Sequence, residues 1–283
     1  MNATDTSIKN EKISIIMGIY NCEKFLSEAI DSILAQTYTD WELIMCNDAS
    51  TDGTLAIAKE YEAKYPDKIK VIENETNSYL AYSLNHCLEY ATGYYIGRMD
   101  GDDISVPERF EKEMKFLKDH PDVDMVGCQM QHFNEKGLGN INPAPVRPDK
   151  WILRKKQPFV HATILGYRYV FDKCGGYTVA ERTRRAQDYD LWFKFYYNGF
   201  VADNVQEPLY LMREDLNAFK RRTLKVRWNA FKTTRIGYKL LGYPKRWLVK
   251  KFITMLFKGL TPAWIQQAHR EKQQKKKEQQ MHQ

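Results

Sequence analysis

The segment RMDGDD (98–103) places three carboxylates, those of Asp100, Asp102 and Asp103, within four positions of the chain. Carboxylates this close repel one another unless a cation or hydrogen-bond donors offset their charge. Mg²⁺ and Mn²⁺ prefer oxygen ligands, and proteins commonly hold them with one or two carboxylates plus phosphate oxygens of a substrate. The segment therefore predicts a divalent metal site at Asp100 and Asp102. Asp103 is explained equally well as the cap of a following helix, and Asp-Gly pairs also occur in ordinary turns.

Two other segments carry polar residues that could act on a ligand. In CNDASTDGT (46–54), Asp48 ends an apolar run, where its carboxylate could accept a hydrogen bond from a base or a ribose. The Ser, Thr and Asp residues that follow it are expected to cap a helix. In AQDYDLWFKF (186–195), Asp188 opens an amphipathic segment, where the helix dipole favours a carboxylate. Asp188 could act there as a general base, although a surface charge on a helix explains this segment equally well.

Alternating strands and helices are expected to position these residues. Apolar runs typical of buried strands occur at residues 13–21, 41–48, 68–74 and 94–100. Between these runs, apolar residues recur at helical spacing over 22–36, 50–65 and 81–91. This alternation predicts an α/β fold in which a parallel sheet is covered by helices. Since ligands bind at the carboxyl ends of the strands in such sheets, Tyr20, Asp48 and Asp100 are expected to meet in one crevice.

The second half of the chain is expected to add further elements. A helix is predicted over 105–118, with Ser105 as its cap and Pro107 in its first turn. The remaining predictions are strands over 123–133 and 205–213, a loop rich in Gly, Asn and Pro over 137–148, and a helix over 186–200. His161 lies in an apolar segment, so it is expected to be a packed, hydrogen-bonded side chain, with a role on the acceptor side as the alternative.

Charge is distributed unevenly along the chain. Its 43 Lys and Arg and 36 Asp and Glu give a formal net charge of +7. Residues 220–283 contain 18 of the basic and 2 of the acidic residues, a charge of +16, which leaves 25 and 34, a charge of −9, for residues 1–219. An acidic domain over 1–219 is therefore expected to precede a basic, amphipathic helical tail over 220–283. The last residues of this tail, about 15, are expected to be disordered.

Cysteine usage and hydropathy bear on the compartment. The five cysteines are scattered and odd in number, which predicts free thiols in a cytoplasmic protein and neither a zinc site nor disulfides. Residues 1–12 lack the apolar core of a signal peptide, and no apolar run reaches the roughly 18 residues of a spanning helix.

The tail mixes Lys and Arg with Trp, Phe and Leu, as peripheral helices on an anionic membrane face do. Packing of the tail against the rest of the protein is the alternative.

Four motifs in this order resemble glycosyltransferase family 2, the inverting nucleotide-sugar transferases of the GT-A fold. The resemblance covers residues 12–215. IIMGIYN (15–21) is similar to the first-strand signature, CNDASTDGT to the family's DDGSTDGT, RMDGDD to its Asp-x-Asp-Asp loop, and QDYDLW (187–192) to its EDYDLW. PERFEKEMKFLKDHPDVDMVGC (107–128) further resembles a bacterial branch of the family that assembles polysaccharides.

This resemblance implies a GT-A fold, in which a mixed sheet is flanked by helices. It implies transfer of a sugar from a nucleotide-diphospho-sugar, most often UDP-linked, to a hydroxyl group of a lipid-linked or growing glycan. Carried over by position, Tyr20 lines the base pocket and Asp48 binds the base. Asp100 and Asp102 hold the ribose and a divalent cation, Mn²⁺ or Mg²⁺, with Asp102 the firmer metal ligand. Asp188 is then the catalytic base.

The sequence departs from the family pattern at four positions. Asn47 replaces an aspartate, Ala49 replaces a glycine, Gln187 replaces a glutamate, and Leu84 stands where many relatives carry an arginine. The first two leave Asp48 in place. Without that arginine, the preference for uridine rests on the resemblance alone.

Other classes of function share some of these features. A nucleotidyltransferase also uses paired aspartates on an α/β sheet, but it would bring a Gly-rich, basic phosphate loop near the N-terminus, and IYNCEKF (19–25) is neither. A non-catalytic sugar-binding protein would not need a base such as Asp188. A nucleic-acid-binding protein could use the basic tail, but its acidic body would remain unexplained.

Overall fold

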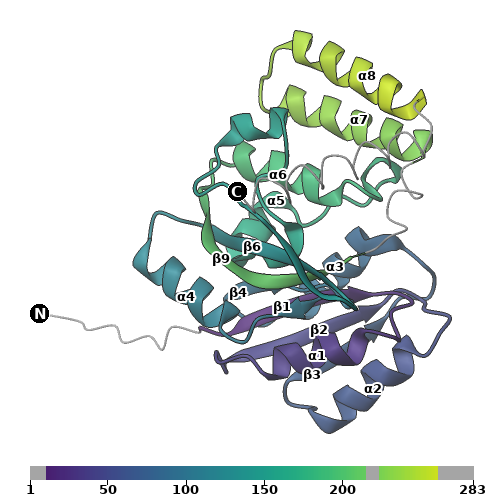
Figure 1. The fold of residues 1–283 in the computed structure, drawn as a ribbon, viewed down its shortest axis with the longest axis vertical. Coiled ribbons are helices and arrows are strands. Elements are labelled where there is room, and N and C mark those ends of the chain that lie inside the picture. The colour runs from purple at the N-terminus through teal and green to yellow at the C-terminus, as the bar shows by residue number, and fades with distance from the viewer. Residues whose placement is uncertain (1–10, 215–222, 261–283) are drawn as a thin grey trace, which may run out of the picture.

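The computed structural model of the chain describes residues 11–214 and 223–260. Within these residues, a mixed sheet of nine strands lies between two layers of helices (Figure 1). The strands are β1 Ile13–Ile19, β2 Trp41–Asn47, β3 Ile69–Glu73, β4 Tyr95–Arg98, β5 Ile104–Ser105, β6 Met125–Asn134, β7 Gly137–Asn142, β8 Leu165–Tyr167 and β9 Ala202–Arg213. The helices are α1 Leu26–Leu34, α2 Thr54–Lys64, α3 Tyr79–Tyr90, α4 Arg109–Asp119, α5 Arg168–Cys174, α6 Gln187–Tyr197, α7 Leu224–Leu240 and α8 Lys245–Leu260.

The first four strands are parallel and lie in the order β3-β2-β1-β4. Each of them falls within one of the predicted apolar runs, and the helices between them are α1, α2 and α3. The chain steps outward from β1 to β3 and then crosses back to β4 on the other side of β1. The loops that follow β1 and β4 therefore leave the sheet in different directions, which opens a crevice at this carboxyl edge.

The remaining strands make the sheet mixed. β8 is antiparallel to both β4 and β6, whereas β6 and β9 are a long parallel pair. The prediction of a loop over 137–148 is wrong in part, because β7 pairs with β6 as an antiparallel hairpin. All six residues of β7 are exposed, so no alternation of buried and exposed residues marked it as a strand.

The predicted helix over 105–118 begins later than expected. Ile104 and Ser105 form β5, which pairs with β9, and α4 starts at Arg109 with Glu108 at its N-cap position. The Ser105 hydroxyl accepts a hydrogen bond from Gln36 Nε2 at 3.1 Å and therefore does not cap the helix. Pairing with β9, a strand far along the chain, overrides the local helix-start pattern.

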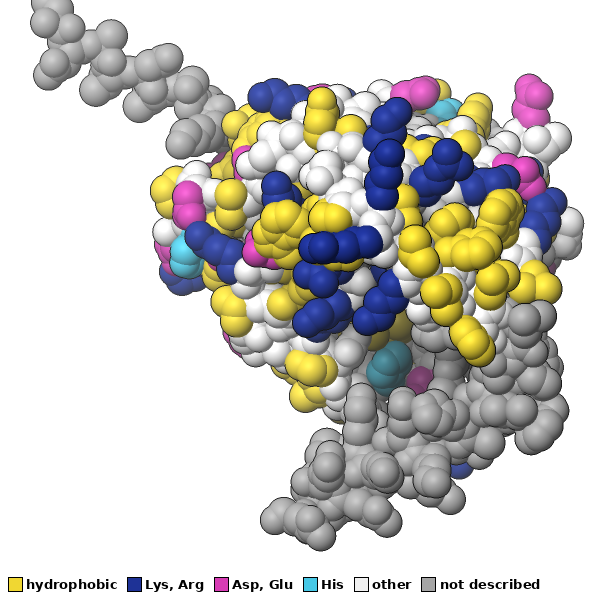
Figure 2. Space-filling model, turned by 90° about the horizontal axis from the view of Figure 1, so that it is seen from above, with side chains coloured by type: hydrophobic (Ala, Val, Ile, Leu, Met, Phe, Trp, Pro, Cys, Tyr) yellow, Lys and Arg dark blue, Asp and Glu magenta, His cyan; other side chains and the backbone are white. Residues whose placement is uncertain are grey.

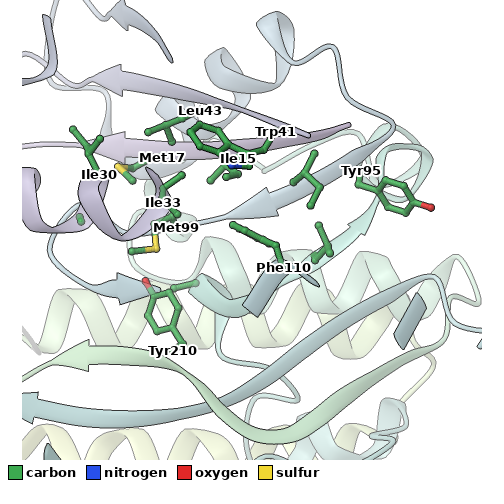
Figure 3. Close-up of a cluster of buried hydrophobic side chains, with 14 of the residues drawn as sticks. Ile15, Met17, Ile30, Ile33, Trp41, Leu43, Tyr95, Met99, Phe110 and Tyr210 are labelled. Carbon is green, nitrogen blue, oxygen red and sulfur yellow. The ribbon is translucent and has the colours of Figure 1, made fainter. Parts of the chain in front are cut away.

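Both faces of the parallel half of the sheet are buried. Ile15 and Met17 of β1 face α1 and α4, where Ile30, Ile33 and Phe110 pack against them (Figure 3). The intervening β1 residues face α3, α5 and α6 on the other side of the sheet. Each fully buried aliphatic or aromatic side chain stabilises the fold by roughly 1.5–3 kcal/mol. The continuous apolar runs are thus explained by burial on both faces.

At one end of the molecule, α7 packs on α6 and α8 packs on α7 (Figure 1). Tyr238 of α7 is buried and its ring contacts that of Phe193, with 5.9 Å between the centroids. Phe252 of α8 packs in turn against Trp228 and Phe231 of α7. The described part of the basic tail thus consists of the helices α7 and α8, and one side of α7 packs against the body. The predicted boundary at 219/220 and the predicted disordered end lie outside the described residues.

Candidate functional site

A pocket of about 430 Å³ opens at the carboxyl ends of β1 and β2. Its lining comes from three separate parts of the chain: Gly18, Ile19, Tyr20 and Asp48 from the strand ends, Asn77, Tyr79, Leu80 and Ser83 from the start of α3, and Arg184, Arg185, Gln187 and Asp188 from the start of α6. The fold thus brings Tyr20, Asp48 and Asp188 together. Asp100 and Asp102, on the loop after β4, do not line this pocket.

Backbone and side-chain donors orient the buried Asp48 carboxylate. Its Oδ1 accepts hydrogen bonds from Asn74 Nδ2 at 2.7 Å and from the Ser78 N–H at 2.8 Å. Its Oδ2 accepts one from the Tyr79 N–H at 2.8 Å. A carboxylate has about four acceptor positions, so three are used and about one remains for a ligand.

Side chains tie the loops after β1 and β2 together beside this pocket. Asn21 Oδ1 accepts from the Thr51 N–H at 2.8 Å, and the Asn21 N–H donates to Ser50 Oγ at 3.1 Å. None of the residues expected to cap α2 stands at its N-cap position, which is Gly53, although Asp52 accepts a hydrogen bond from the N–H of Thr54 at 3.0 Å. Ser50 and Thr51 instead fix the position of the neighbouring loop.

Three non-glycine residues around the pocket have left-handed backbone conformations. The φ angles are 49° at Asn21, 57° at Ala49 and 67° at Tyr79. For residues with a Cβ this region is unfavourable by on the order of 1–2 kcal/mol. Such strain tends to gather at functional sites. It also gives a physical reason for the family's glycine at the position of Ala49.

Arg98, a buried cation at the end of β4, holds Asp100. Its Nη2 donates to Asp100 Oδ1 at 2.6 Å, and the Arg98 side chain is 1% exposed. Burial disfavours the guanidinium charge, but the Asp100 carboxylate outweighs burial and raises the pKa of Arg98. Arg98 Nε and Nη1 have no hydrogen-bond partner among the described residues. The Arg98 charge also counteracts the rise in the pKa of Asp102 and of Asp188.

The prediction that Asp103 caps a helix is wrong. Asp103 is buried and accepts hydrogen bonds from the Tyr210 hydroxyl at 3.0 Å and from the Arg213 N–H at 2.8 Å, both in β9. Burial, followed by the charges of Asp100 and Asp102, raises the pKa of Asp103 to about 8. Through these two hydrogen bonds, Asp103 anchors the acidic loop, residues 100–103, to β9. It does not cap α4, since β5 lies between this loop and the helix.

Asp100 and Asp102 fit a divalent cation that is completed by a substrate. In residues 11–214 and 223–260, no group of three or more His, Cys, Asp or Glu side chains could hold a metal ion by itself. Mg²⁺ typically takes one or two carboxylates and completes its shell with phosphate oxygens and water. Loss of water around Asp102, followed by the Asp100 charge, raises the pKa of Asp102. Arg98 and Arg213 offset only part of this negative charge, and a cation would neutralise the rest.

Asp188 lies in the first turn of α6 and faces the pocket. Its Oδ2 accepts from Gln157 Nε2 and its Oδ1 from the Tyr189 N–H, both at 2.7 Å. Burial raises the pKa of Asp188, and these two hydrogen bonds partly offset the rise. A raised pKa makes the carboxylate a better proton acceptor near neutral pH. Asp188 is thus not a charge on an exposed helix face.

His161 is packed and hydrogen-bonded, as predicted. Its Nε2 is 2.9 Å from the Tyr177 hydroxyl, and burial, followed by the Arg98 charge, lowers its pKa well below the usual value. Asn85 holds the Tyr177 backbone through bonds of 2.8 Å and 2.7 Å. Sequence reasoning did not single out Arg98 or Gln157. Arg98 could have been noticed as a charge ending an apolar run, whereas Gln157 lies in an irregular segment without a recognisable pattern.

The chain matches a known family and is similar to curated proteins. The sequence model described as Glycosyl transferase family 2 matches residues 14–183. The chain is 52% identical over 212 residues to the putative glycosyltransferase EpsE of Bacillus subtilis, an overlap of 75% of this chain and 76% of EpsE. It is 30% identical over 255 residues to the O-antigen biosynthesis glycosyltransferase WbnJ of Escherichia coli, an overlap of 87% and 94%.

Two solved structures share the fold. Residues 1–349 of S. aureus TarS, in complex with UDP-GlcNAc, match with a TM-score of 0.67 at 21% identity, and the match covers 81% of this chain and 66% of that one. The mannosyltransferase PcManGT of Pyrobaculum calidifontis, in complex with GDP-Man and Mn²⁺, matches with a TM-score of 0.61 at 21% identity, covering 91% and 78%. These likenesses confirm the predicted GT-A fold.

Proposed function

The chain belongs to glycosyltransferase family 2 and is a glycosyltransferase, and we propose that it transfers a sugar from a nucleotide-diphospho-sugar to a hydroxyl acceptor with inversion. The observation that carries this proposal is the pocket that contains Tyr20, Asp48 and Asp188. It combines a carboxylate that could bind the nucleotide base (Asp48), an aromatic ring at its rim (Tyr20) and a proton acceptor (Asp188). A site that only binds a ligand would not need the proton acceptor.

Asp48 and Tyr20 are proposed to bind the nucleotide base. About one acceptor position of the Asp48 carboxylate remains unused, and the N3–H of uracil could donate to it. The Tyr20 ring is half-exposed beside this position. We favour a UDP-linked donor, with a GDP-linked one as the next choice. TarS binds UDP-GlcNAc and PcManGT binds GDP-Man in their solved structures, which supports this class of donor.

Asp188 is proposed to accept the proton of the acceptor hydroxyl. That oxygen forms its bond to the anomeric carbon on the face opposite the leaving diphosphate, as the bond to the phosphate oxygen breaks. Gln157 holds the carboxylate in place, and the raised pKa of Asp188 strengthens it as a base. A divalent cation at Asp100 and Asp102 would stabilise the negative charge that develops on the leaving diphosphate.

The acceptor is proposed to be a lipid-linked or growing glycan in cell-surface polysaccharide assembly. The name of WbnJ, an O-antigen biosynthesis glycosyltransferase, supports this class of acceptor. α7 and α8 each contain five Lys or Arg residues and no Asp or Glu. Val249, Ile253 and Leu256 form one exposed apolar face of α8. Figure 2, which looks onto this end of the molecule, shows basic and apolar side chains interspersed. We propose that this end rests peripherally on an anionic membrane, at its cytoplasmic face.

The described helices do not include one that is both long and apolar enough to cross a membrane. Co-sedimentation with anionic liposomes therefore tests the peripheral attachment. The full chain should pellet with such liposomes, and the triple substitution of Val249, Ile253 and Leu256 by Ser should release it. Leu138→Ser, at an equally exposed apolar position on β7, is the control and should not change binding. A wild-type protein that stays in the supernatant would exclude this attachment.

The proposed reaction is tested with a panel of UDP-, GDP- and dTDP-sugars. At least one of these sugars should raise the melting temperature of the protein or be hydrolysed in a Mn²⁺- or Mg²⁺-dependent way. If no sugar of the panel gives either signal, the proposal is refuted. Asp188→Asn should reduce transfer by about 10²–10⁴-fold, the usual contribution of a general base, while donor binding persists. Asp102→Ala should also weaken metal-dependent donor binding. Asp67→Asn, at an exposed position, is the charge-matched control.

A further inference from the structure

A second pocket, of about 200 Å³, adjoins the donor pocket. The two pockets share Tyr79, Arg184 and Arg185. The opposite side of the second pocket is the N-terminal part of α7, from Thr223 to Ala230. We call this second cavity the α7 pocket. It lies between the proposed donor site and the helices proposed to rest on the membrane.

Positive charge dominates the α7 pocket. Its charged lining residues are the cations Arg182, Arg184, Arg185 and Lys225 and one anion, Glu181. Arg182 is paired with the buried Asp190, and Lys225 with Glu181 at 2.9 Å. Arg184 and Arg185 form no ion pair with any carboxylate of residues 11–214 and 223–260. Both guanidinium groups are therefore without an ion-pair partner in the described structure, although the charge of Glu181, which is paired with Lys225, also acts on Arg184.

Tyr79 connects these arginines to the donor pocket. The Arg184 guanidinium lies over the Tyr79 ring at 4.1 Å from its centroid, and its Nη1 donates to the Tyr79 hydroxyl at 3.1 Å. The backbone of Tyr79 is in turn held by Asp48. Stacking occupies the face of a guanidinium and leaves in-plane N–H groups available, which match a phosphate bidentately.

The N-terminus of α7 adds to this positive field. α7 has 17 residues and is capped by Thr223, whose side chain accepts from the Val226 N–H. Thr223, Lys225 and Val226 all line the α7 pocket, so the positive end of the helix dipole lies at this cavity. The N-terminus of a long helix favours anions in a cavity that it borders. The unpaired arginines and the helix end thus point independently to an anionic ligand.

We propose that the α7 pocket binds a diphosphate group carried by the sugar acceptor. This inference rests on the proposed function of the donor pocket. The donor's own diphosphate is expected beside Asp100 and Asp102, and these residues line neither pocket. Asp188 and Arg185 line the same donor pocket, so a sugar attached to a diphosphate bound at Arg185 can present its hydroxyl near the base. The enzyme would then select acceptors attached to a phosphorylated carrier.

Binding of decyl diphosphate to the full chain tests this assignment by calorimetry. UDP and Mg²⁺ are present at saturating concentration, so that the donor site is filled. Decyl maltoside, which has the same chain and a neutral head, is the ligand control. The wild type should bind decyl diphosphate and not decyl maltoside. The Arg184→Gln/Arg185→Gln double variant should bind decyl diphosphate at least about tenfold more weakly, since a charge-assisted hydrogen bond is typically worth that factor or more.

Two further variants control for charge and for folding. Arg235→Gln/Lys239→Gln removes the same charge from α7 at positions that line a different pocket, and it should leave the affinity unchanged. Arg184→Lys/Arg185→Lys keeps the charge but loses the planar donors, so its affinity should be intermediate. All four positions, Arg184, Arg185, Arg235 and Lys239, are exposed, so all three variants should fold.

Several results would overturn the assignment. One is a wild type that, with UDP bound, does not bind decyl diphosphate, and another is equal affinity in the Arg184→Gln/Arg185→Gln variant. A third is that this variant loses affinity for UDP, which would assign the two arginines to the donor diphosphate. If no nucleotide binds at all, the proposed donor function fails, and the α7 pocket is then judged by decyl diphosphate binding to the nucleotide-free protein.

Discussion

Glu113 and Arg109 form a fully buried ion pair beneath the end of β4. Arg109 Nε is 3.3 Å from Glu113 Oε2, and Arg109 Nη2 donates to the Arg98 carbonyl at 2.7 Å. The pair therefore supports the strand end that leads into Asp100. Burial raises the pKa of Glu113 to about 7, and the charge of Arg109 only partly offsets this. We predict that Glu113→Gln removes a pH-dependent loss of stability.

The sign and size of this effect follow from proton linkage. Between the ordinary pKa of 4.5 and the folded-state pKa of about 7, the folded chain binds a proton at Glu113 that the unfolded chain does not bind. The contribution of Glu113 to stability is therefore fully present below pH 4.5 and is lost as the pH rises through this window. The full difference corresponds to roughly 3 kcal/mol, most of which is lost between pH 5 and pH 8. The glutamine variant cannot ionise, so it should not lose this amount.

Urea unfolding of the full chain at pH 5 and pH 8 measures the effect. The amide N–H of the variant has no evident acceptor, and this adds a cost of about 1–3 kcal/mol. That cost is independent of pH and cancels when the two pH values are compared. Glu60→Gln, at an exposed position on α2, is the control and should follow the wild type. If Glu113→Gln loses as much stability as the wild type between pH 5 and pH 8, the reasoning is refuted.

Three other substitutions test separate parts of the structure. Arg98→Met removes the charge that counteracts the rise in the pKa of Asp188, so the acidic limb of the pH profile of the transfer rate should move to higher pH. Initial rates that show this limb at an unchanged pH would contradict the prediction. Gly237→Ala places a Cβ against the buried ring of Phe193 and should lower the free energy of unfolding by about 1–3 kcal/mol, and an unchanged melting temperature would argue against that packing. Ala49→Gly should raise stability by roughly 0.5–1 kcal/mol through relief of the left-handed backbone, and a lower urea midpoint would speak against strain.

Much of the first hundred residues was predictable because their elements are encoded locally. β1 to β4 are continuous apolar runs, and the helices between them have apolar faces at helical spacing. The sequence also indicated that Tyr20, Asp48 and Asp100 follow strand ends, since these positions follow directly from the strand boundaries. Elements that lack a buried face, or whose partner lies far along the chain, were less predictable. β7 has no buried face, and Ser105 and Pro107 fit a helix start that pairing with β9 overrides.

The features of the site likewise divide into those that the sequence predicts and those that only the fold establishes. The sequence by itself determined which residue types stand at which strand and helix ends, including the acidic loop and Asp188 in the first turn of α6, because type and spacing are properties of the local chain. Only the tertiary structure decided which charges meet. It turned Asp103 toward β9, buried Arg98 against Asp100, and left Arg184 and Arg185 beside the donor pocket without a described carboxylate partner. Charge pairing and burial depend on the contacts between distant segments, and only the fold establishes those contacts.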